Sequence, residues 1–253
     1  MRTNTNVKYK INDLKHSFKK KEIIKLNELF EYFKLNEPNI KKTTFNWRVY
    51  NLIQKGILSR VGRGEFSISN KSDFIPQIGE DLISYYSKIK SHFPYANVCV
   101  WDTSWLNKFM LHQTSVNYIL LEVEKEVVDS VFYFLKETEN NIFVEPTLDI
   151  LNKYASNNKH SLIVKSLVSE APIQETQSVY TVTIEKILVD VFCDKNLFFA
   201  NQGSELENIF SEIFNNYTVN KNRLYRYASR RQKKENLENY IQDILNPGVK
   251  MYY

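Results

Sequence analysis

A glycine-tipped hairpin pattern over residues 57–68 constrains the fold of this chain more than any other feature. Two runs in which apolar and polar residues alternate flank the triplet Gly62-Arg63-Gly64. Alternation of this kind predicts half-buried strands, and a short glycine-rich connection predicts a tight turn between antiparallel strands. We therefore expect a two-stranded arm that points Arg60 and Arg63 outward.

The residues before this arm show the periodicity of helices. From residue 42 or 43 onward, apolar residues recur at i, i+4, i+7 and i+8, which predicts a buried stripe, and Lys55-Gly56 predicts the end of the helix. Upstream, the pattern predicts a short helix over Lys8–Ser17, a strand over Glu22–Leu26, and a helix that Asn27 caps and that ends before Pro38.

This order of elements predicts a winged helix. In helix-turn-helix geometry the second helix of the pair, here Thr43–Lys55, lies in the major groove of DNA. We expect its polar face to contact bases, because Asn and Arg can bind adenine and guanine edges and Thr can contact a thymine methyl group. The flanking lysines and the hairpin arginines would contact phosphate, or the arginines a minor groove. The candidate DNA-binding residues are Lys41, Lys42, Thr43, Thr44, Asn46, Trp47, Arg48, Arg60 and Arg63.

Two alternatives stay open for this unit. Trp47 is as compatible with packing against the hairpin as with contacting DNA. Winged helices also serve as protein-docking modules, so the same pattern is compatible with a protein partner in place of a nucleic acid.

The charge distribution favours the nucleic-acid interpretation. The whole chain has a net charge of +5, but residues 1–72 carry +10, residues 73–219 carry −10 and residues 220–253 carry +5. A basic head on an acidic body is typical of a phosphate-binding module joined to another domain. Against this, lysine-rich surfaces are common in proteins rich in Asn, Lys and Ile. We expect two domains, 1–72 and 73–253, joined by the polar segment Asp73–Gly79.

The second domain has a mixed α/β pattern. A helical pattern over residues 81–91 precedes strand-like segments that alternate with further helical patterns, which argues for an α/β sheet. From about residue 183 the chain becomes helical, and Thr183 is placed to cap the first of these helices. The predicted fold class is therefore mixed α/β, with an N-terminal winged helix-turn-helix, an α/β domain and a helical C-terminal end. The predicted strands are Val98–Trp101, Tyr118–Val123, Ile142–Val144 and Leu162–Leu167.

Composition argues against several classes of protein. No apolar run approaches a membrane span, the N-terminus leads into lysines in place of an apolar signal core, and two cysteines with four histidines give no recognisable zinc site. We therefore expect a cytoplasmic protein that binds no membrane, metal or cofactor. Nucleotide-binding glycine loops and a nucleophile elbow are missing from the sequence, and we assign no catalytic residue.

A metal-dependent nuclease is a weaker alternative. Such enzymes place one acid on a strand, and an acid and a lysine on the next, to hold Mg²⁺ and orient a water molecule. Asp102 and the run Glu122-Val123-Glu124-Lys125 resemble this pattern, but strict alternation places Lys125 on the face opposite to both glutamates.

A second basic surface is predicted near the C-terminus. Arg223, Arg226 and Arg230 are spaced to share one helical face beside Tyr227, and Arg231 follows. Cations interleaved with aromatic residues suit a nucleic-acid backbone. The alternative is structural: these arginines would form ion pairs with the acidic body, through Glu185, Asp190 or Asp194.

Several short motifs together resemble the AbiEi-like antitoxin family of type IV toxin–antitoxin systems. In the C-terminal part these motifs are Thr183–Asp190, Gly203-Ser204-Glu205, Tyr217-x-x-Asn220 and Tyr227-Ala228-Ser229-Arg230-Arg231. The N-terminal part adds a helix with Trp47-Arg48 and Leu52, followed by Lys55-Gly56-Ile57-Leu58 and Arg60–Gly64. The intervening region matches only loosely, around Trp101-Asp102-Thr103 and Glu122-x-Glu124.

The resemblance implies a bacterial regulator without catalytic activity. Its winged helix would bind double-stranded operator repeats and repress its own operon. Its C-terminal domain would counteract a nucleotidyltransferase-type toxin encoded beside it, through the target or the effect of the toxin and not necessarily by direct contact. The family implies no catalytic residue at any position of this sequence.

Overall fold

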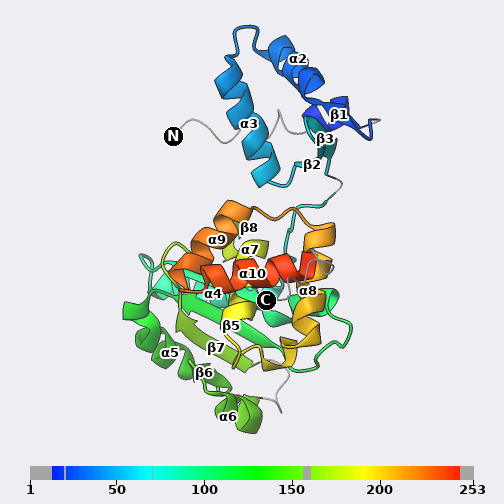
Figure 1. The fold of residues 1–253 in the computed structure, drawn as a ribbon. Coiled ribbons are helices and arrows are strands. Elements are labelled where there is room, and N and C mark those ends of the chain that lie inside the picture. The colour runs from blue at the N-terminus through cyan, green and yellow to red at the C-terminus, as the bar shows by residue number, and fades with distance from the viewer. Residues whose placement is uncertain (1–12, 20, 70, 156–160, 246–253) are drawn as a thin grey trace. The chain divides into compact units, whose positions relative to one another are not determined.

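The fold is mixed α/β, as predicted, and its residue contacts divide it into two compact units (Figure 1). The computed structural model describes residues 13–19, 21–69, 71–155 and 161–245. Unit 1 contains residues up to 73 together with 216–221, and unit 2 contains residues 74–215 and those from 222 onward. Each unit has its own sheet, so each is considered separately.

Unit 1 consists of helices and a small antiparallel sheet. Its strand order is β1-β3-β2, and β2 and β3 form the predicted hairpin around Gly62-Arg63-Gly64. This order of elements is compatible with the predicted winged helix. Residues 13–17 are helical, whereas residues 8–12 of the first predicted helix lie outside the described part. The other elements are β1 (Ile24–Lys25), α2 (Leu26–Asn36), α3 (Lys42–Gln54), β2 (Leu58–Gly62) and β3 (Glu65–Ile68).

The core of unit 1 confirms the helical stripe predicted for α3. Phe45, Val49 and Leu52 are buried in one cluster with Leu29 of α2 and Phe66 of β3. Burial of this stripe fixes the rotation of α3, because the opposite side of the helix must then face outward.

The ends of the two helices follow different rules. Gly56 has a φ of +66° directly after α3, a left-handed conformation that glycine adopts without steric cost, so the predicted end is confirmed. The predicted cap of α2 is wrong, because the helix already begins at Leu26 and includes Asn27. The carboxylate of Glu28 instead accepts the backbone N–H of Lys25 at 2.9 Å.

Unit 2 is built on a four-stranded sheet with the order β4-β5-β7-β6. β4 runs antiparallel to β5, whereas β5, β7 and β6 are parallel. One face of this sheet is apolar and packs with α4 and α5 in a single core cluster. The other face carries the charged residues Glu122 and Lys165, which are neighbours across β5 and β7. The elements are α4 (Glu80–His92), β4 (Val98–Asp102), β5 (Tyr118–Val123), α5 (Val128–Lys136), β6 (Ile142–Val144) and β7 (Ser161–Ser166).

Short helical segments and a second hairpin complete the α/β part of unit 2. The short helical segments are Thr103–Phe109, Lys125–Val127, α6 (Leu148–Ile150), Leu151–Ala155 and Phe199–Asn201. The antiparallel hairpin of β8 (Ile173–Thr176) and β9 (Val179–Val182) was not predicted.

The predicted helical end is confirmed. It comprises α7 (Ile184–Cys193), α8 (Ser204–Asn216), α9 (Lys221–Arg230) and α10 (Lys234–Leu245). Among the described residues, no helix has both the length and the apolar character that crossing a bilayer requires.

Thr183 caps α7 as predicted, and its removal should destabilise unit 2. Its hydroxyl oxygen accepts the N–H of Lys186 at 3.4 Å, and its O–H donates to the carbonyl of Pro172 at 3.1 Å. We expect Thr183→Ala to lower the free energy of unfolding by about 1 kcal/mol, the usual cost of losing an N-cap. Urea denaturation measures this change. Thr183→Ser keeps the hydroxyl group and should lose much less, and equal losses in the two variants would contradict the capping role.

Candidate nucleic-acid interface

The outward face of α3 combines polar and aromatic side chains. Thr43, Trp47 and Tyr50 are spaced i, i+4 and i+7 and therefore lie along one line of the helix. Trp47 exposes 66% of its surface and Tyr50 exposes 52%. Thr43 and Asn46 are also exposed, and Thr44 is half-buried. Trp47 is therefore not buried against the hairpin.

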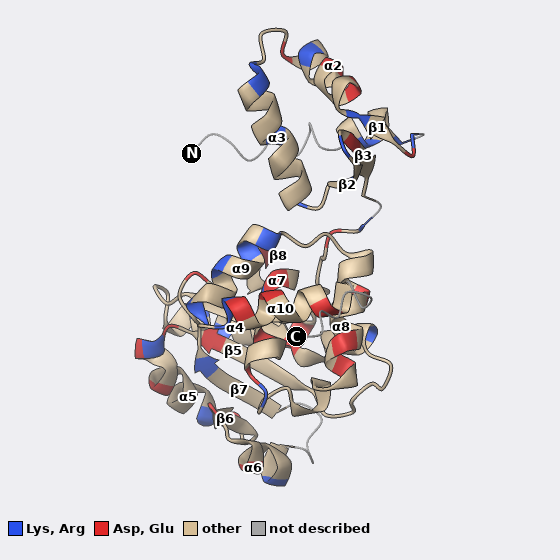
Figure 2. Cartoon of the chain, in the orientation of Figure 1, with Lys and Arg blue, Asp and Glu red and all other residues tan. Residues whose placement is uncertain are grey.

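Exposed cations lie at the start of α3 and on the hairpin. Lys41 and Lys42 are exposed at the start of α3, and Arg60 and Arg63 are exposed on the hairpin. Arg60 donates from Nε to the carbonyl of Gly62 at 3.3 Å, which holds its side chain along the arm. The middle of α3 is largely uncharged, whereas blue segments mark its beginning and the region of the small sheet (Figure 2). Exposed cations of this kind can contact the phosphates of a nucleic acid.

Arg48 differs from the other candidate DNA-binding residues because its guanidinium already forms an ion pair. Its Nη1 lies 2.7 Å from Oε2 of Glu37, in the connection between α2 and α3. The guanidinium also lies over the ring of Phe33, 5.7 Å from the ring centroid. These contacts hold Arg48 at the flank of α3 and not at the centre of its outward face.

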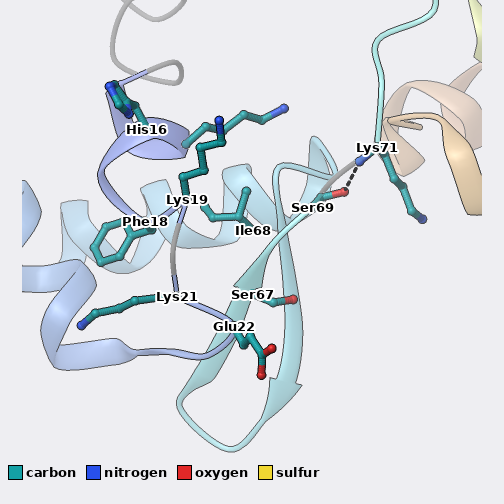
Figure 3. A pocket seen from close by; sticks show the side chains of 10 residues that line it. His16, Phe18, Lys19, Lys21, Glu22, Ser67, Ile68, Ser69 and Lys71 are labelled. Carbon is teal, nitrogen blue, oxygen red and sulfur yellow. Dashed lines mark hydrogen bonds between the residues drawn. The ribbon is translucent and has the colours of Figure 1, made fainter.

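A lysine-lined cavity forms a second cationic feature of unit 1 (Figure 3). It has a volume of about 1040 Å³ between the first helical segment and β3. Burial and the charge of Lys221 lower the pKa of Lys71. We did not predict this cavity, although Lys15 and Lys19 show the i, i+4 spacing that places two cations on one helical face. It adds to the positive field of unit 1, which attracts polyanions over long distances. The lysines that line it are Lys15, Lys19, Lys21 and Lys71, and His16 and Glu22 also line it.

Unit 2 contains a buried network of charges that the sequence pattern did not predict. Lys186 of α7 is fully buried, and its Nζ lies 2.7 Å from both carboxylate oxygens of Glu122 on β5. The same ammonium group donates to Asp190, one turn further along α7. Trp101 of β4 donates from its indole nitrogen to Glu122 at 2.9 Å. The only sequence signal for this network is the pair Lys186 and Asp190. These residues lie four positions apart on a helix whose core-facing side is otherwise apolar.

Asp190 joins this network to α9. It accepts a hydrogen bond from the hydroxyl of Tyr227 at 2.8 Å and another from Arg231 at 3.2 Å. Burial raises the pKa of the Asp190 carboxyl, but the neighbouring charges of Lys186, Lys165 and Arg231 outweigh burial and lower it overall. Burial and the negative charge of Asp190 raise the pKa of Tyr227, so its hydroxyl stays protonated and donates.

The second basic surface is therefore mostly committed to ion pairs. Arg231 contacts Asp190, and Arg223 lies 3.5 Å from Glu185, which are two of the pairs that the structural alternative predicts. Arg230 pairs with Glu170. Asp194 binds Lys165 at 2.6 Å. Arg226 is exposed, and no ion pair of Arg226 is found within the described part of the chain.

The acids of the nuclease alternative do not converge. Asp102 accepts the backbone N–H of Ser104 at 2.7 Å, while Glu122 binds Trp101 and Lys186. In the β4–β5 register, Asp102 is opposite Ile119 and Glu122 is opposite Cys99, so the two carboxylates point to opposite faces of the sheet. No group of three or more His, Cys, Asp or Glu residues that could hold a metal ion is found among the described residues.

Fold and surface together define a mixed α/β protein with a separate basic unit that exposes one helix face. Residues 44–247 match the family of unknown function DUF6577, so the chain belongs to this family. The match begins inside α3 and extends through α10. No match to a curated protein was found.

Proposed function

We propose that this protein is a DNA-binding antitoxin that represses its own operon, and that unit 1 binds duplex operator DNA as a winged helix. The observation that carries the proposal is the division of α3 into two sides. Phe45, Val49 and Leu52 are buried, while the side that carries Trp47 and Asn46 is exposed, and exposed cations lie at the start of α3 and on the hairpin. An exposed helix side of this kind fits the major groove, and the cations fit the phosphates along its edges.

The charge of the chain supports this function. Residues 1–72 carry a net charge of +10, whereas residues 73–219 carry −10. Phosphates therefore attract the basic unit and repel the acidic part of the body, which directs a duplex toward α3 and the hairpin.

The resemblance to AbiEi-like antitoxins supports the second half of the proposal. The motifs that carry the resemblance in the C-terminal part, Thr183–Asp190 and Tyr227–Arg231, contain Lys186, Asp190 and the partners of Asp190 in the buried network. In the proposed function this part of the chain counteracts a nucleotidyltransferase-type toxin in the bacterial cytoplasm. It acts on the target or effect of the toxin and performs no catalysis.

A mobility shift with the DNA just upstream of the protein's own operon tests the proposal. Wild-type protein should bind this duplex, and the double variant Arg63→Ala with Thr44→Ala should bind it about tenfold or more weakly, because it loses one phosphate contact and one base contact. Lys136→Ala removes an exposed cation from unit 2, outside both predicted basic surfaces, and serves as the control. The absence of any shift at low salt would contradict DNA binding.

A protein-docking function is the second candidate. The exposed Trp47 and Tyr50 favour it, because these residue types are enriched among the residues that dominate protein–protein binding energy. Under this alternative, the product of the neighbouring gene should be captured at high salt and Trp47→Ala should abolish the capture, while no DNA shift occurs. Under the DNA-binding proposal, Trp47→Ala weakens the shift.

A further inference from the structure

We propose that α3 selects A·T base pairs, with Trp47 and Thr43 in contact with thymine methyl groups and Asn46 bound to adenine. The inference rests on the proposed function and deepens it, because it names the class of duplex that unit 1 recognises. It depends on which side chains of α3 are free to enter a groove and which are held elsewhere.

The centre of the outward face of α3 is uncharged. Successive residues of an α-helix are rotated by about 100°, so Thr43, Trp47 and Tyr50 lie close to the direction opposite the buried Phe45, Val49 and Leu52. With 66% of its surface exposed, Trp47 presents a large apolar surface at this point. In the major groove, the thymine C5-methyl group is the apolar feature that such a surface can contact.

The residue that would read guanine is held away from this face. An arginine that donates two hydrogen bonds to O6 and N7 is the commonest specific contact to guanine. Arg48 is the one arginine within Lys42–Gln54. Its guanidinium is bound to Glu37 at 2.7 Å and lies over Phe33, so reading guanine would require both contacts to break.

The polar side chains that remain favour adenine and thymine. Asn46 is exposed, and an asparagine amide can donate to N7 of adenine while it accepts from the N6 amino group. The methyl group of Thr43 can pack on a thymine methyl group beside Trp47. Lys41 and Lys42 lie at the very start of α3, where they face the backbone phosphates.

Three duplexes of equal length and equal salt concentration test the inference by fluorescence anisotropy. The first contains only A·T pairs, the second replaces every thymine with uracil, and the third contains only G·C pairs. Uracil lacks the C5-methyl group but keeps the hydrogen-bonding edge of thymine. Wild-type protein should bind the thymine duplex about tenfold more tightly than the uracil duplex or the G·C duplex.

Variants assign this preference to particular side chains. Trp47→Ala should lose most of the preference for the thymine duplex over the uracil duplex, because it has lost the larger of the two groups that contact thymine methyls. Trp47→Phe should keep part of the preference. Tyr95→Ala removes an aromatic side chain of unit 2 that is 97% exposed, and this control should retain the wild-type ratio. The circular dichroism spectrum of each variant checks that it is folded.

A further variant should gain affinity for G·C base pairs. Glu37→Ala releases Arg48, so its affinity for the G·C duplex should rise and its ratio of A·T to G·C binding should fall several-fold. Glu31→Ala removes the same charge from α2 but leaves Arg48 bound to Glu37, and it should keep the wild-type ratio.

The outcomes separate the inference from the function on which it rests. Equal binding of the thymine, uracil and G·C duplexes would overturn the inference and leave DNA binding intact. Failure to bind any of the three duplexes at low salt would overturn both.

Discussion

Replacement of Lys186 with alanine is expected to lower the free energy of unfolding by about 3–5 kcal/mol, which is the usual cost of breaking a buried ion pair. The variant removes the ammonium group that binds Glu122 and Asp190, and both carboxylates stay buried. A buried charge without its partner is strongly unfavourable, because it has lost its hydration without compensation. Urea or thermal denaturation measures the change.

Two comparisons make this test specific. Lys195→Ala removes an exposed lysine and should change stability by less than about 0.5 kcal/mol, as is usual for surface substitutions. The triple variant Lys186→Met, Glu122→Gln and Asp190→Asn removes all three charges and should recover part of the loss, because neither carboxylate is left buried with an uncompensated charge. A loss below about 1 kcal/mol for Lys186→Ala would show that the network contributes little.

The pH dependence of stability provides a further readout of the same network. The pKa of Asp190 in the folded protein lies below its ordinary value of 3.8, so this group contributes stability above pH 3.8 that is lost as the pH falls through the folded pKa. The pKa of Lys186 lies well above 10.5, since the attraction of Asp190 and Glu122 outweighs the opposing effect of burial. Its contribution is present below pH 10.5 and is lost as the pH rises through the folded pKa. The Lys186→Ala variant should not show this loss of stability at high pH.

Removal of four cations from unit 1 should cause the largest change in DNA binding. We expect the variant with Lys41, Lys42, Arg60 and Arg63 all replaced by alanine to bind operator DNA on the order of 10³-fold more weakly at 0.1 M salt, because each phosphate contact releases about 0.9 counterion. Fluorescence anisotropy measures this change. The effect should be similar for unrelated duplexes, since phosphate contacts carry no sequence information.

A charge-matched variant controls for net charge alone. Lys125, Lys136, Lys153 and Lys195 are exposed lysines of unit 2, and their replacement by alanine changes the net charge of the chain by the same amount. This variant should bind within a few-fold of wild type. A comparable loss of affinity in both variants would show that DNA binding depends on the overall charge of the chain and not on Lys41, Lys42, Arg60 and Arg63.

Local patterns made much of unit 1 predictable. Alternation around Gly62-Arg63-Gly64 predicted the hairpin, and the apolar spacing from Phe45 to Ile53 predicted both α3 and its buried side. Each of these signals is contained within about a dozen residues. The pairing of Arg48 with Glu37 was not predictable in this way, because it depends on how the connection between α2 and α3 folds. The sequence pattern alone placed Arg48 among the DNA-binding residues.

Unit 2 shows why other features could not be predicted. The turn between β8 and β9 is formed by Gln177 and Ser178, with φ values of +51° and +63°, so the glycine that usually marks such a turn is missing. Lys186 binds Glu122, a residue 64 positions earlier in the chain. Long-range pairing of this kind depends on strand order, which the alternation of strands and helices does not specify.

The salt dependence of binding to the protein's own upstream DNA tests whether unit 1 binds duplex phosphates. We expect wild-type protein to bind this duplex at 50 mM salt and log Kd to rise linearly with log salt concentration, with a slope of about 3 to 4 from Lys41, Lys42, Arg60 and Arg63. No binding at 50 mM salt, or an affinity that does not change with salt, would contradict the claim that unit 1 binds duplex phosphates.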